Sequence, residues 1–409
     1  MTAASGANDL GAQPRVFRRR VFYIPGYDPF HPRRYRELYR TESAEQARIS
    51  GYDIALKPKT TKGSYGWHVA ARIGGAEAVA DVDVLVWSDL VKSSMERGIA
   101  GTYAQMVRTA WAYIGSGALA RLMRLRKGPM IAALYPIVFL VVQLGIAVLA
   151  GWGLGRLAAQ INPVLGWGVG LGLIWALLDL FRRWDNKVFA YYLMHDYAYS
   201  AQAGGANPPE LEARMATFGA AIAAAMAQDL DEVLVVGHSS GAHLAVSILS
   251  DLIRDHGAAA GPALGFLSLG QVVPMVSFLP KAARLRADLA YLCSRDELTW
   301  IDVTAPGDGC AFALCDPVSV SGVAPATGKK WPLVLSAAFT QTLSPERWKQ
   351  LRWRFFRLHF QYLCAFDRPG DYDYFQITAG PMTLAARYAG RAASKSRIET
   401  SVNRYTGLQ

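Results

Sequence analysis

Two long apolar runs, separated by a short connection, limit the fold of this 409-residue chain more than any other feature of its sequence. Residues 131–155 carry no charged side chain, and neither do residues 163–178. A helix needs about 20 apolar residues to cross roughly 30 Å of bilayer hydrocarbon, and each run is near that length. We therefore expect a hairpin of two membrane spans, over about residues 131–155 and 163–181. The alternatives are a hairpin buried inside a soluble protein and one that dips into the bilayer without crossing it.

Basic residues gather on the outer flanks of this hairpin. The chain has 43 Lys and Arg against 32 Asp and Glu, a formal net charge of +11, and the connection between the runs holds only Arg156. The flanking basic residues are Arg121, Arg124, Arg126, Lys127, Arg182, Arg183 and Lys187. Since cytoplasmic flanks carry the excess of basic residues, we expect both outer ends in the cytoplasm, at a membrane of the bacterial inner type. Residues 103–127 mix apolar and basic side chains, which predicts an amphipathic segment along an anionic leaflet.

Glycines recur within both runs. They are Gly151, Gly155, Gly166, Gly168, Gly170 and Gly172. Small residues let two helices approach closely, so the pattern predicts a tightly packed pair of spans. Such packing can form within one chain or between two subunits, and the oligomeric state therefore stays open.

Outside the hairpin, short β-branched runs alternate with segments of helical pattern. The strands that we expect cover residues 21–24, 67–73, 82–87, 233–236, 264–269, 300–303 and 351–358. The expected helices cover residues 37–49, 209–228, 240–255 and 280–292. This alternation predicts an α/β protein with a mainly parallel, doubly wound sheet that helices cover on both faces.

These patterns also predict the organisation of the chain. In order, we expect a flexible tail at 1–14, the first part of an α/β domain at 15–100, the amphipathic segment with its hairpin at 101–187, the second part of the domain at 188–390, and a C-terminal tail at 391–409. The catalytic residues are expected in the second part of the domain.

A pentapeptide, Gly237-His238-Ser239-Ser240-Gly241, stands between the strand expected at 233–236 and the helix that follows. A serine on a sharp strand-to-helix turn projects its hydroxyl above the sheet, and the two glycines remove the Cβ atoms that would crowd such a turn. The helix N-terminus then offers backbone N–H groups to an oxyanion. We therefore predict that Ser239 is a nucleophile, and an ordinary Gly-Ser turn is the alternative.

In this context the motif resembles the nucleophile elbow of the α/β-hydrolase superfamily, over roughly residues 17–30, 80–90 and 230–385. The resemblance implies a serine esterase or lipase-like enzyme with a triad in the chain order serine, acid, histidine. Of the seven histidines, only His359 lies beyond the next two strands after Ser239, so it is the expected general base. A histidine buried in an aromatic cluster is the alternative.

Two aspartates are the main candidates for the acid, and Asp308 is slightly favoured over Asp316. Asp308 lies in the loop after the strand expected at 300–303, where the family carries its acid, and Asp316 begins an Asp-Pro-Val turn that resembles the family's. Asp302 and Asp296 are further candidates. One of these carboxylates is expected to orient His359 and stabilise its imidazolium form.

The resemblance also implies an oxyanion hole. The family uses the N–H of the residue after the nucleophile, here Ser240, and a second N–H from a loop after an earlier strand. Tyr27 would supply the second, with Gly26 allowing close approach, although a plain Pro-Gly turn is the alternative. Lid insertions in the family commonly follow the nucleophile strand, whereas this hairpin precedes it, so we interpret the hairpin as an anchor.

Metal and cofactor chemistry find little support in the sequence. The four cysteines form no C-x-x-C spacing, and no H-E-x-x-H motif is present, so we predict neither a metal nor a cofactor. His238 and His243 are expected to orient or pack rather than to catalyse. Few cysteines in a long chain fit a reducing compartment.

The function that these features favour is a membrane-anchored serine hydrolase that cleaves carboxylic esters, including lipid acyl esters, through an acyl-enzyme. An acyltransferase or thioesterase would use the same triad, and a non-catalytic, membrane-attached scaffold is a different class. Basic and aromatic residues alternate at 347–357, but no recognition motif accompanies them, so nucleic acid is not an expected partner. The expected partners are a lipid bilayer and an ester or lipid substrate.

Overall fold

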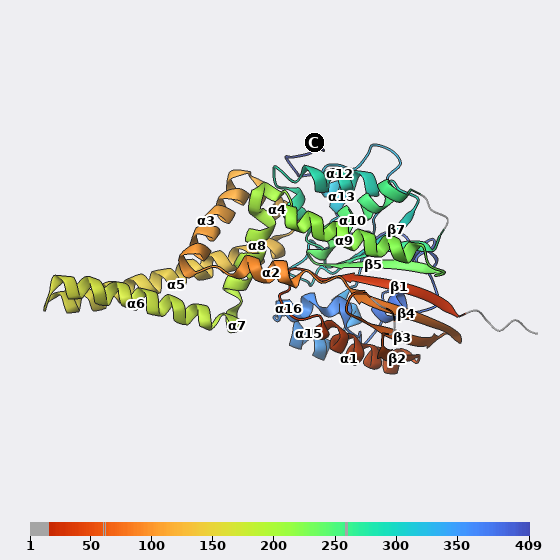
Figure 1. Ribbon diagram of the computed structural model, residues 1–409, viewed down its shortest axis with the longest axis horizontal. Helices are drawn as coiled ribbons and strands as arrows, with labels where there is room; N and C mark the ends of the chain where they lie inside the picture. The colour runs from red at the N-terminus through yellow and green to blue at the C-terminus, as the bar shows by residue number, and fades with distance from the viewer. Residues whose placement is uncertain (1–15, 60, 62, 258–260) are drawn as a thin grey trace, which may run out of the picture.

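A computed structural model describes residues 16–59, 61, 63–257 and 261–409, and the tail predicted at 1–14 lies outside these residues. An eight-stranded sheet with the order β2-β3-β4-β1-β5-β6-β7-β8 forms its centre (Figure 1). The strands are β1 (Phe17–Ile24), β2 (Asp53–Pro58), β3 (Gly66–Ile73), β4 (Ala76–Val84), β5 (Glu232–His238), β6 (Ala263–Leu269), β7 (Leu298–Thr304) and β8 (Leu333–Ser336). Six neighbouring strands of the sheet pair in parallel, in the order β4, β1, β5, β6, β7 and β8. The β2–β3 and β3–β4 pairs are antiparallel. The predicted α/β class with a mainly parallel sheet is confirmed.

Helices cover both faces of this sheet. They are α1 (Arg33–Ser50), α2 (Ser88–Met95), α3 (Ile99–Gly115), α4 (Ala118–Leu125), α5 (Lys127–Ala159), α6 (Pro163–Arg183), α7 (Asp185–Val188), α8 (Ala190–Ala201), α9 (Pro209–Met226), α10 (Gly241–His256), α11 (Val273–Ser277), α12 (Ala283–Leu292), α13 (Pro317–Val320), α14 (Phe339–Thr342), α15 (Pro345–Leu351), α16 (Phe355–His359), α17 (Tyr374–Ala379) and α18 (Leu384–Arg387), with short 3-10 turns at Gln202–Gly205 and Gln361–Leu363.

Strand β5 shows how the two faces are filled. Successive side chains of a strand point to opposite faces. Val233 and Val235 join the apolar cluster that includes α9, α10 and α12, whereas Leu234 and Val236 join the cluster that includes α1 and α17. All four side chains are fully buried, as expected for a central parallel strand.

Three parts of the sheet differ from the prediction. The strand expected at 351–358 is wrong: α15 and α16 occupy this stretch, because Ser344 Oγ accepts a hydrogen bond from Arg347 N at 3.2 Å and Pro345 begins a helix. The last strand is β8 instead, a four-residue element paired with β7. The edge strand β2 was also not predicted, since most of its residues are exposed and it lacks a buried apolar run. Finally, β4 ends at Val84, so it begins and ends earlier than the strand expected at 82–87.

Helices α5 and α6 form an antiparallel pair that projects from the rest of the protein (Figure 1). Both are long and apolar enough to cross a membrane, and only 22% and 17% of their most apolar windows are buried. A core hairpin of a soluble protein would be mostly buried. Gly155 and Gly166 lie at the contact: a Cβ at Gly155 would lie 2.8 Å from the Gly166 carbonyl oxygen. The close glycine-mediated packing that we predicted is therefore present within one chain, although Gly168 and Gly172 have no neighbouring atom within 4 Å of a built Cβ.

Two of the predicted domain boundaries, at residues 188 and 391, do not match the packing in the structure. Helix α8, predicted in the second part of the α/β domain, packs against α3 and α5. The predicted C-terminal tail lies against the domain, because Ile398 N donates to Leu314 O at 2.7 Å and Ile398 O accepts from Asp316 N at 2.9 Å. The side chain of Asn403 adds a 3.0 Å hydrogen bond to Ser277 O.

Candidate active site

Ser239 occupies a sharp turn between β5 and α10. Its φ of 57° is in the left-handed region, which a residue with a side chain adopts at an energetic cost. Its N–H donates to Leu269 O at 2.9 Å, which ties the turn to the end of β6. A Cβ at Gly237 would lie 2.8 Å from Gly241 O, and a Cβ at Gly241 would overlap the carbonyl oxygen of Ile24. Both glycines of the motif are therefore required by close backbone approach.

The predicted histidine and one predicted aspartate form a buried pair. His359 ends α16, and its Nδ1 lies 2.7 Å from Asp308 Oδ2. The same carboxylate accepts hydrogen bonds from Tyr362 Oη at 3.0 Å and from Cys310 N at 2.8 Å. Burial acts to raise the pKa of Asp308, but the imidazole of His359 and these donors outweigh burial and hold the pKa below its usual range. Asp308 is thus an ionised hydrogen-bond acceptor for the imidazole.

Asp316 is not part of this pair, which corrects one of the two positions predicted for the acid. Its Oδ1 accepts from Val318 N and Ser319 N, both at 3.0 Å, and its Oδ2 pairs with Lys329. Asp316 therefore caps the short helix α13. The structure brings Asp308, and not Asp316, to the imidazole.

The two remaining candidates for the acid also have other partners. Asp302 accepts a 2.5 Å hydrogen bond from Ser268 Oγ, and burial raises its pKa to about 8. Asp296 forms an ion pair with Lys330 at 2.5 Å. Neither carboxylate replaces Asp308 beside His359.

Ser239 and His359 line the same cavity, whose volume of about 580 Å³ is typical of small-molecule sites. Gly26, Tyr27 and Ser240 line it as well. A Cβ built at Gly26 would lie 3.0 Å from Ser239 Cβ and 3.4 Å from its Oγ, so the loop after β1 passes directly beside the serine. Apart from Asp316, the predicted site residues thus meet at one place, with Asp308 behind His359.

No family model, curated protein or solved structure matches this chain. The function therefore has to be inferred from the chemistry of the site itself, because a fold class alone does not determine activity.

Both predicted oxyanion residues, Tyr27 and Ser240, line the cavity. Among the described residues, no group accepts a hydrogen bond from the backbone N–H of Tyr27 or of Ser240. The loop around Tyr27 is fixed by Trp87 Nε1, which donates to Pro25 O at 2.9 Å, and by Tyr192 Oη, which donates to Tyr27 O. Among the described residues, the backbone N–H groups of Tyr27 and Ser240 are thus unpaired at the cavity, and two hydrogen bonds hold the Tyr27 loop.

His238 supports His359 from within the motif. Its Nε2 donates to His359 O at 3.0 Å, and the two rings lie 4.8 Å apart between centroids. Burial, helped by His359, lowers the pKa of His238 to about 3, so the ring is neutral at physiological pH. His243 is also buried on α10, where burial lowers its pKa to about 4. The predicted orienting and packing roles agree with these positions.

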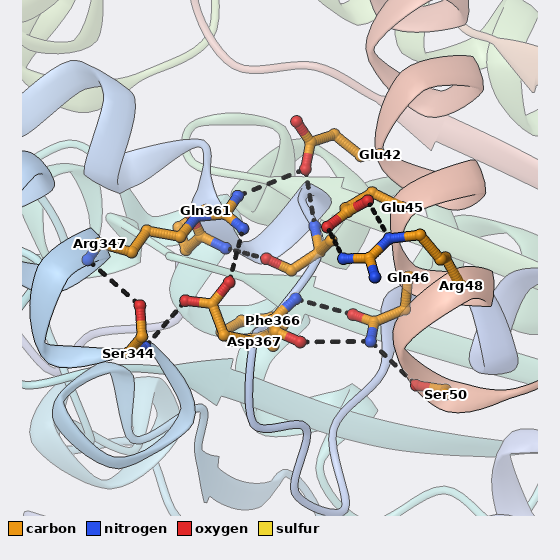
Figure 2. Close-up of polar contacts among 11 residues, drawn as sticks. Glu42, Glu45, Gln46, Arg48, Ser50, Ser344, Arg347, Gln361, Phe366 and Asp367 are labelled. Carbon is orange, nitrogen blue, oxygen red and sulfur yellow. Dashed lines mark hydrogen bonds and ion pairs between the residues drawn. The ribbon is translucent and has the colours of Figure 1, made fainter.

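The segment after His359 is anchored by a polar network that the sequence did not reveal (Figure 2). Gln46 of α1 accepts from Phe366 N at 2.7 Å, and Glu42 accepts from Ala365 N at 2.9 Å. Arg347 of α15 pairs with Asp367 at 3.2 Å and with Glu42 at 3.5 Å. At least one arginine of the basic and aromatic stretch at 347–357 therefore has a structural role.

The base of the hairpin contributes one wall of the cavity, which was also not predicted. Pro129 at the start of α5, Asp185 and Phe189 just after α6, and Asp196 on α8 line it. Asp185 caps α8 by accepting from Tyr191 N at 2.8 Å and from Tyr192 N at 3.0 Å. The interpretation of the hairpin as an anchor alone is therefore incomplete, because its ends also shape the site.

A metal ion would compete with the hydrogen bond between His359 and Asp308 for ligands. Asp308, Cys310 and His359 offer three ligand atoms within 4.8 Å of one another, a set that suits a borderline ion such as Zn²⁺. The hydrogen bond between Asp308 and His359 already engages two of these groups. Cys310 is a free thiol whose pKa burial raises, which disfavours the thiolate that binds metal.

Proposed function

We propose that this protein is a serine hydrolase of the α/β-hydrolase type that cleaves a carboxylic ester through an acyl-enzyme intermediate. The observation that carries the proposal is the shared cavity of Ser239 and His359, with Asp308 hydrogen-bonded to the imidazole at 2.7 Å. The order of the three residues along the chain, serine, acid and histidine, agrees with the order in that superfamily.

In the proposed reaction, Ser239 Oγ attacks the ester carbonyl while Nε2 of His359 accepts the hydroxyl proton. The carbonyl oxygen becomes an oxyanion that accepts hydrogen bonds from Tyr27 N and Ser240 N. Collapse of this intermediate breaks the bond to the alcohol, which leaves with the proton from His359. A water then attacks the acyl-enzyme by the same route and releases the acid.

The oriented pair explains why His359 can act as the base. Because Nδ1–H donates to Asp308, the lone pair of the neutral imidazole is on Nε2. The ionised carboxylate then stabilises the imidazolium that forms during the attack.

The hairpin supports a membrane location for this activity. Tyr103 Oη donates to Leu140 O at 3.0 Å, so α3 holds α5 near its middle. The part of α5 beyond Leu140 contains about 20 residues, which is about 30 Å of helix and enough to cross the hydrocarbon layer. The basic flanks favour a cytoplasmic position for the domain.

Helix α3 carries an apolar ridge at the level where the hairpin leaves the domain. Its residues Val107, Trp111 and Ile114 are 63%, 76% and 60% exposed, and their spacing of four and three places them on one helix face. An exposed ridge with a central Trp is typical of a helix at the membrane interface. The ridge and the hairpin would therefore bring the cavity close to a lipid leaflet.

The proposal is tested by labelling with a fluorophosphonate probe, which reacts with an activated serine. Purified full-length protein in detergent should be labelled, and the variant Ser239→Ala should not. The variant Ser64→Ala is the matched control, because Ser64 is exposed between β2 and β3 and does not line the cavity, so labelling should persist. Equal labelling of the wild type and Ser239→Ala would exclude Ser239 as the nucleophile.

A further inference from the structure

One carboxyl group in the cavity around Ser239 has no protein partner among the described residues. Of its three carboxylates, Asp28 accepts a 2.6 Å hydrogen bond from Tyr35 Oη, and Asp185 caps α8. Asp196 differs from both: among the described residues, none donates a hydrogen bond to it or forms an ion pair with it. It lies on α8, which α3 and α5 hold in place.

Asp196 is half-buried, so its carboxyl is open to solvent in the cavity, and apolar side chains lie around it. Leu193, Phe189 and Met275 contribute apolar surface to the same cavity. Burial raises the pKa of Asp196 to about 7, and the imidazole of His359 only partly counteracts this rise. A polar group in an apolar site costs free energy unless it receives a hydrogen bond. A bound molecule that displaces water from the cavity would therefore have to supply a donor to this carboxyl.

We propose that Asp196 accepts a hydrogen bond from the alcohol part of the substrate, so that the preferred substrate is an acyl ester of a polyol. This inference rests on the proposed hydrolase function. A plain acyl chain offers no hydrogen-bond donor, so the donor has to come from the alcohol, whereas the apolar side chains of the cavity suit the acyl chain. A carboxyl group accepts a hydrogen bond in both of its protonation states, so the interaction does not depend on which state is present.

The test compares two esters of the same acid, glyceryl monobutyrate and propyl butyrate, which differ in the two free hydroxyls of the glycerol part. With full-length protein in detergent, we expect the kcat/KM for the glyceryl ester to exceed that for the propyl ester by about tenfold, since only the glyceryl ester offers a donor to the Asp196 carboxyl. Asp196→Leu should reduce this ratio about tenfold. Asp196→Asn, which keeps an acceptor oxygen, should reduce it less.

Asp255→Leu is the matched control, because Asp255 is exposed near the end of α10 and does not line the cavity. The ratio of kcat/KM for the glyceryl ester to kcat/KM for the propyl ester should be the same in Asp255→Leu as in the wild type. The inference is overturned, with the hydrolase intact, if Ser239 is labelled by the fluorophosphonate but the wild type hydrolyses both esters equally, or if Asp196→Leu leaves the ratio unchanged. If Asp196→Leu does not fold, the inference is still tested by the ratio of the two kcat/KM values in the wild type and in Asp196→Asn. Absence of both labelling and hydrolysis in the wild type overturns the proposed function and this inference together.

Discussion

His359 Nδ1 and Asp308 Oδ2 lie 2.7 Å apart, although 51 positions separate the two residues in the chain. The loop after β7 carries the aspartate, and the short helix α16 carries the histidine. Tyr362 Oη reaches the same carboxylate oxygen at 3.0 Å, and His238 holds the backbone of His359. Asp308 therefore orients the imidazole directly, while Tyr362 fixes the carboxylate and His238 fixes the backbone of His359, an arrangement that suits the proposed general base.

Asp308→Asn should lower kcat for a p-nitrophenyl ester by roughly 10³- to 10⁴-fold, because an amide in place of the carboxylate favours the wrong imidazole tautomer. KM should change little. Asp316→Asn is the matched control, since Asp316 caps α13 rather than contacting His359. It should lower the melting temperature while kcat of the folded fraction stays near that of the wild type. Comparable losses of kcat in the two variants would contradict the assignment of the acid.

Gly241→Ala should destabilise the protein by about 1–3 kcal/mol or more, because the new Cβ overlaps the backbone oxygen of Ile24. Gly219→Ala should have the opposite effect. Gly219 lies within α9, where a Cβ would be 4.0 Å from the nearest atom, Ile248 Cγ2, so replacing glycine in the helix should stabilise by about 0.5–1 kcal/mol. Denaturant unfolding measures both changes. If Gly241→Ala left the free energy of unfolding unchanged, the turn between β5 and α10 would not be as tightly packed as described.

Asp302→Asn should make the protein's stability less dependent on pH. Burial raises the pKa of Asp302 to about 8 in the folded state, well above its value in an unfolded chain. The folded state therefore holds this proton while the unfolded state loses it, and wild-type stability should fall as the pH rises from about 4 to about 8. Asparagine cannot titrate, and its side-chain oxygen can still accept the bond from Ser268. The melting temperature of the variant minus that of the wild type should increase as the pH is raised from 5 to 8. A difference that stays constant over this range would contradict the buried, protonated state of Asp302.

A nitroxide label on Trp111→Cys should lie in lipid when the full-length protein is in nanodiscs with anionic lipid. Trp111 is 76% exposed on the α3 ridge, and aromatic side chains favour the interface. The label should collide more with oxygen, which concentrates in lipid, than with a water-soluble nickel complex. A label on Asp255→Cys is the control and should show the reverse preference. The unsubstituted chain, with four free cysteines, gives the background. A water-exposed label at position 111 would remove the interfacial role of α3.

The features that the sequence determined are those encoded within a few neighbouring residues. The turn at Ser239 follows from a β-branched strand, two glycines and a helix start within ten positions, and only glycine fits where Gly241 meets Ile24. Likewise, the length and apolarity of residues 131–155 are enough to predict a long apolar helix. Alternating apolar strands and helices were enough to predict a mainly parallel sheet.

Tertiary structure alone decided which distant groups meet. Asp308 and Asp316 follow the same strand and look alike in sequence, and only the packing of α16 shows that one contacts the imidazole while the other caps a helix. The alternating residues at 351–358 resemble a strand, yet α15 and α16 form there, and Glu42, Gln46 and Arg347 hold the loop at 365–367 that follows. Asp196 gives no local signal at all, because its place in the cavity depends on how α8 packs against α3 and α5. Such contacts join residues tens to hundreds of positions apart, and no local pattern specifies them.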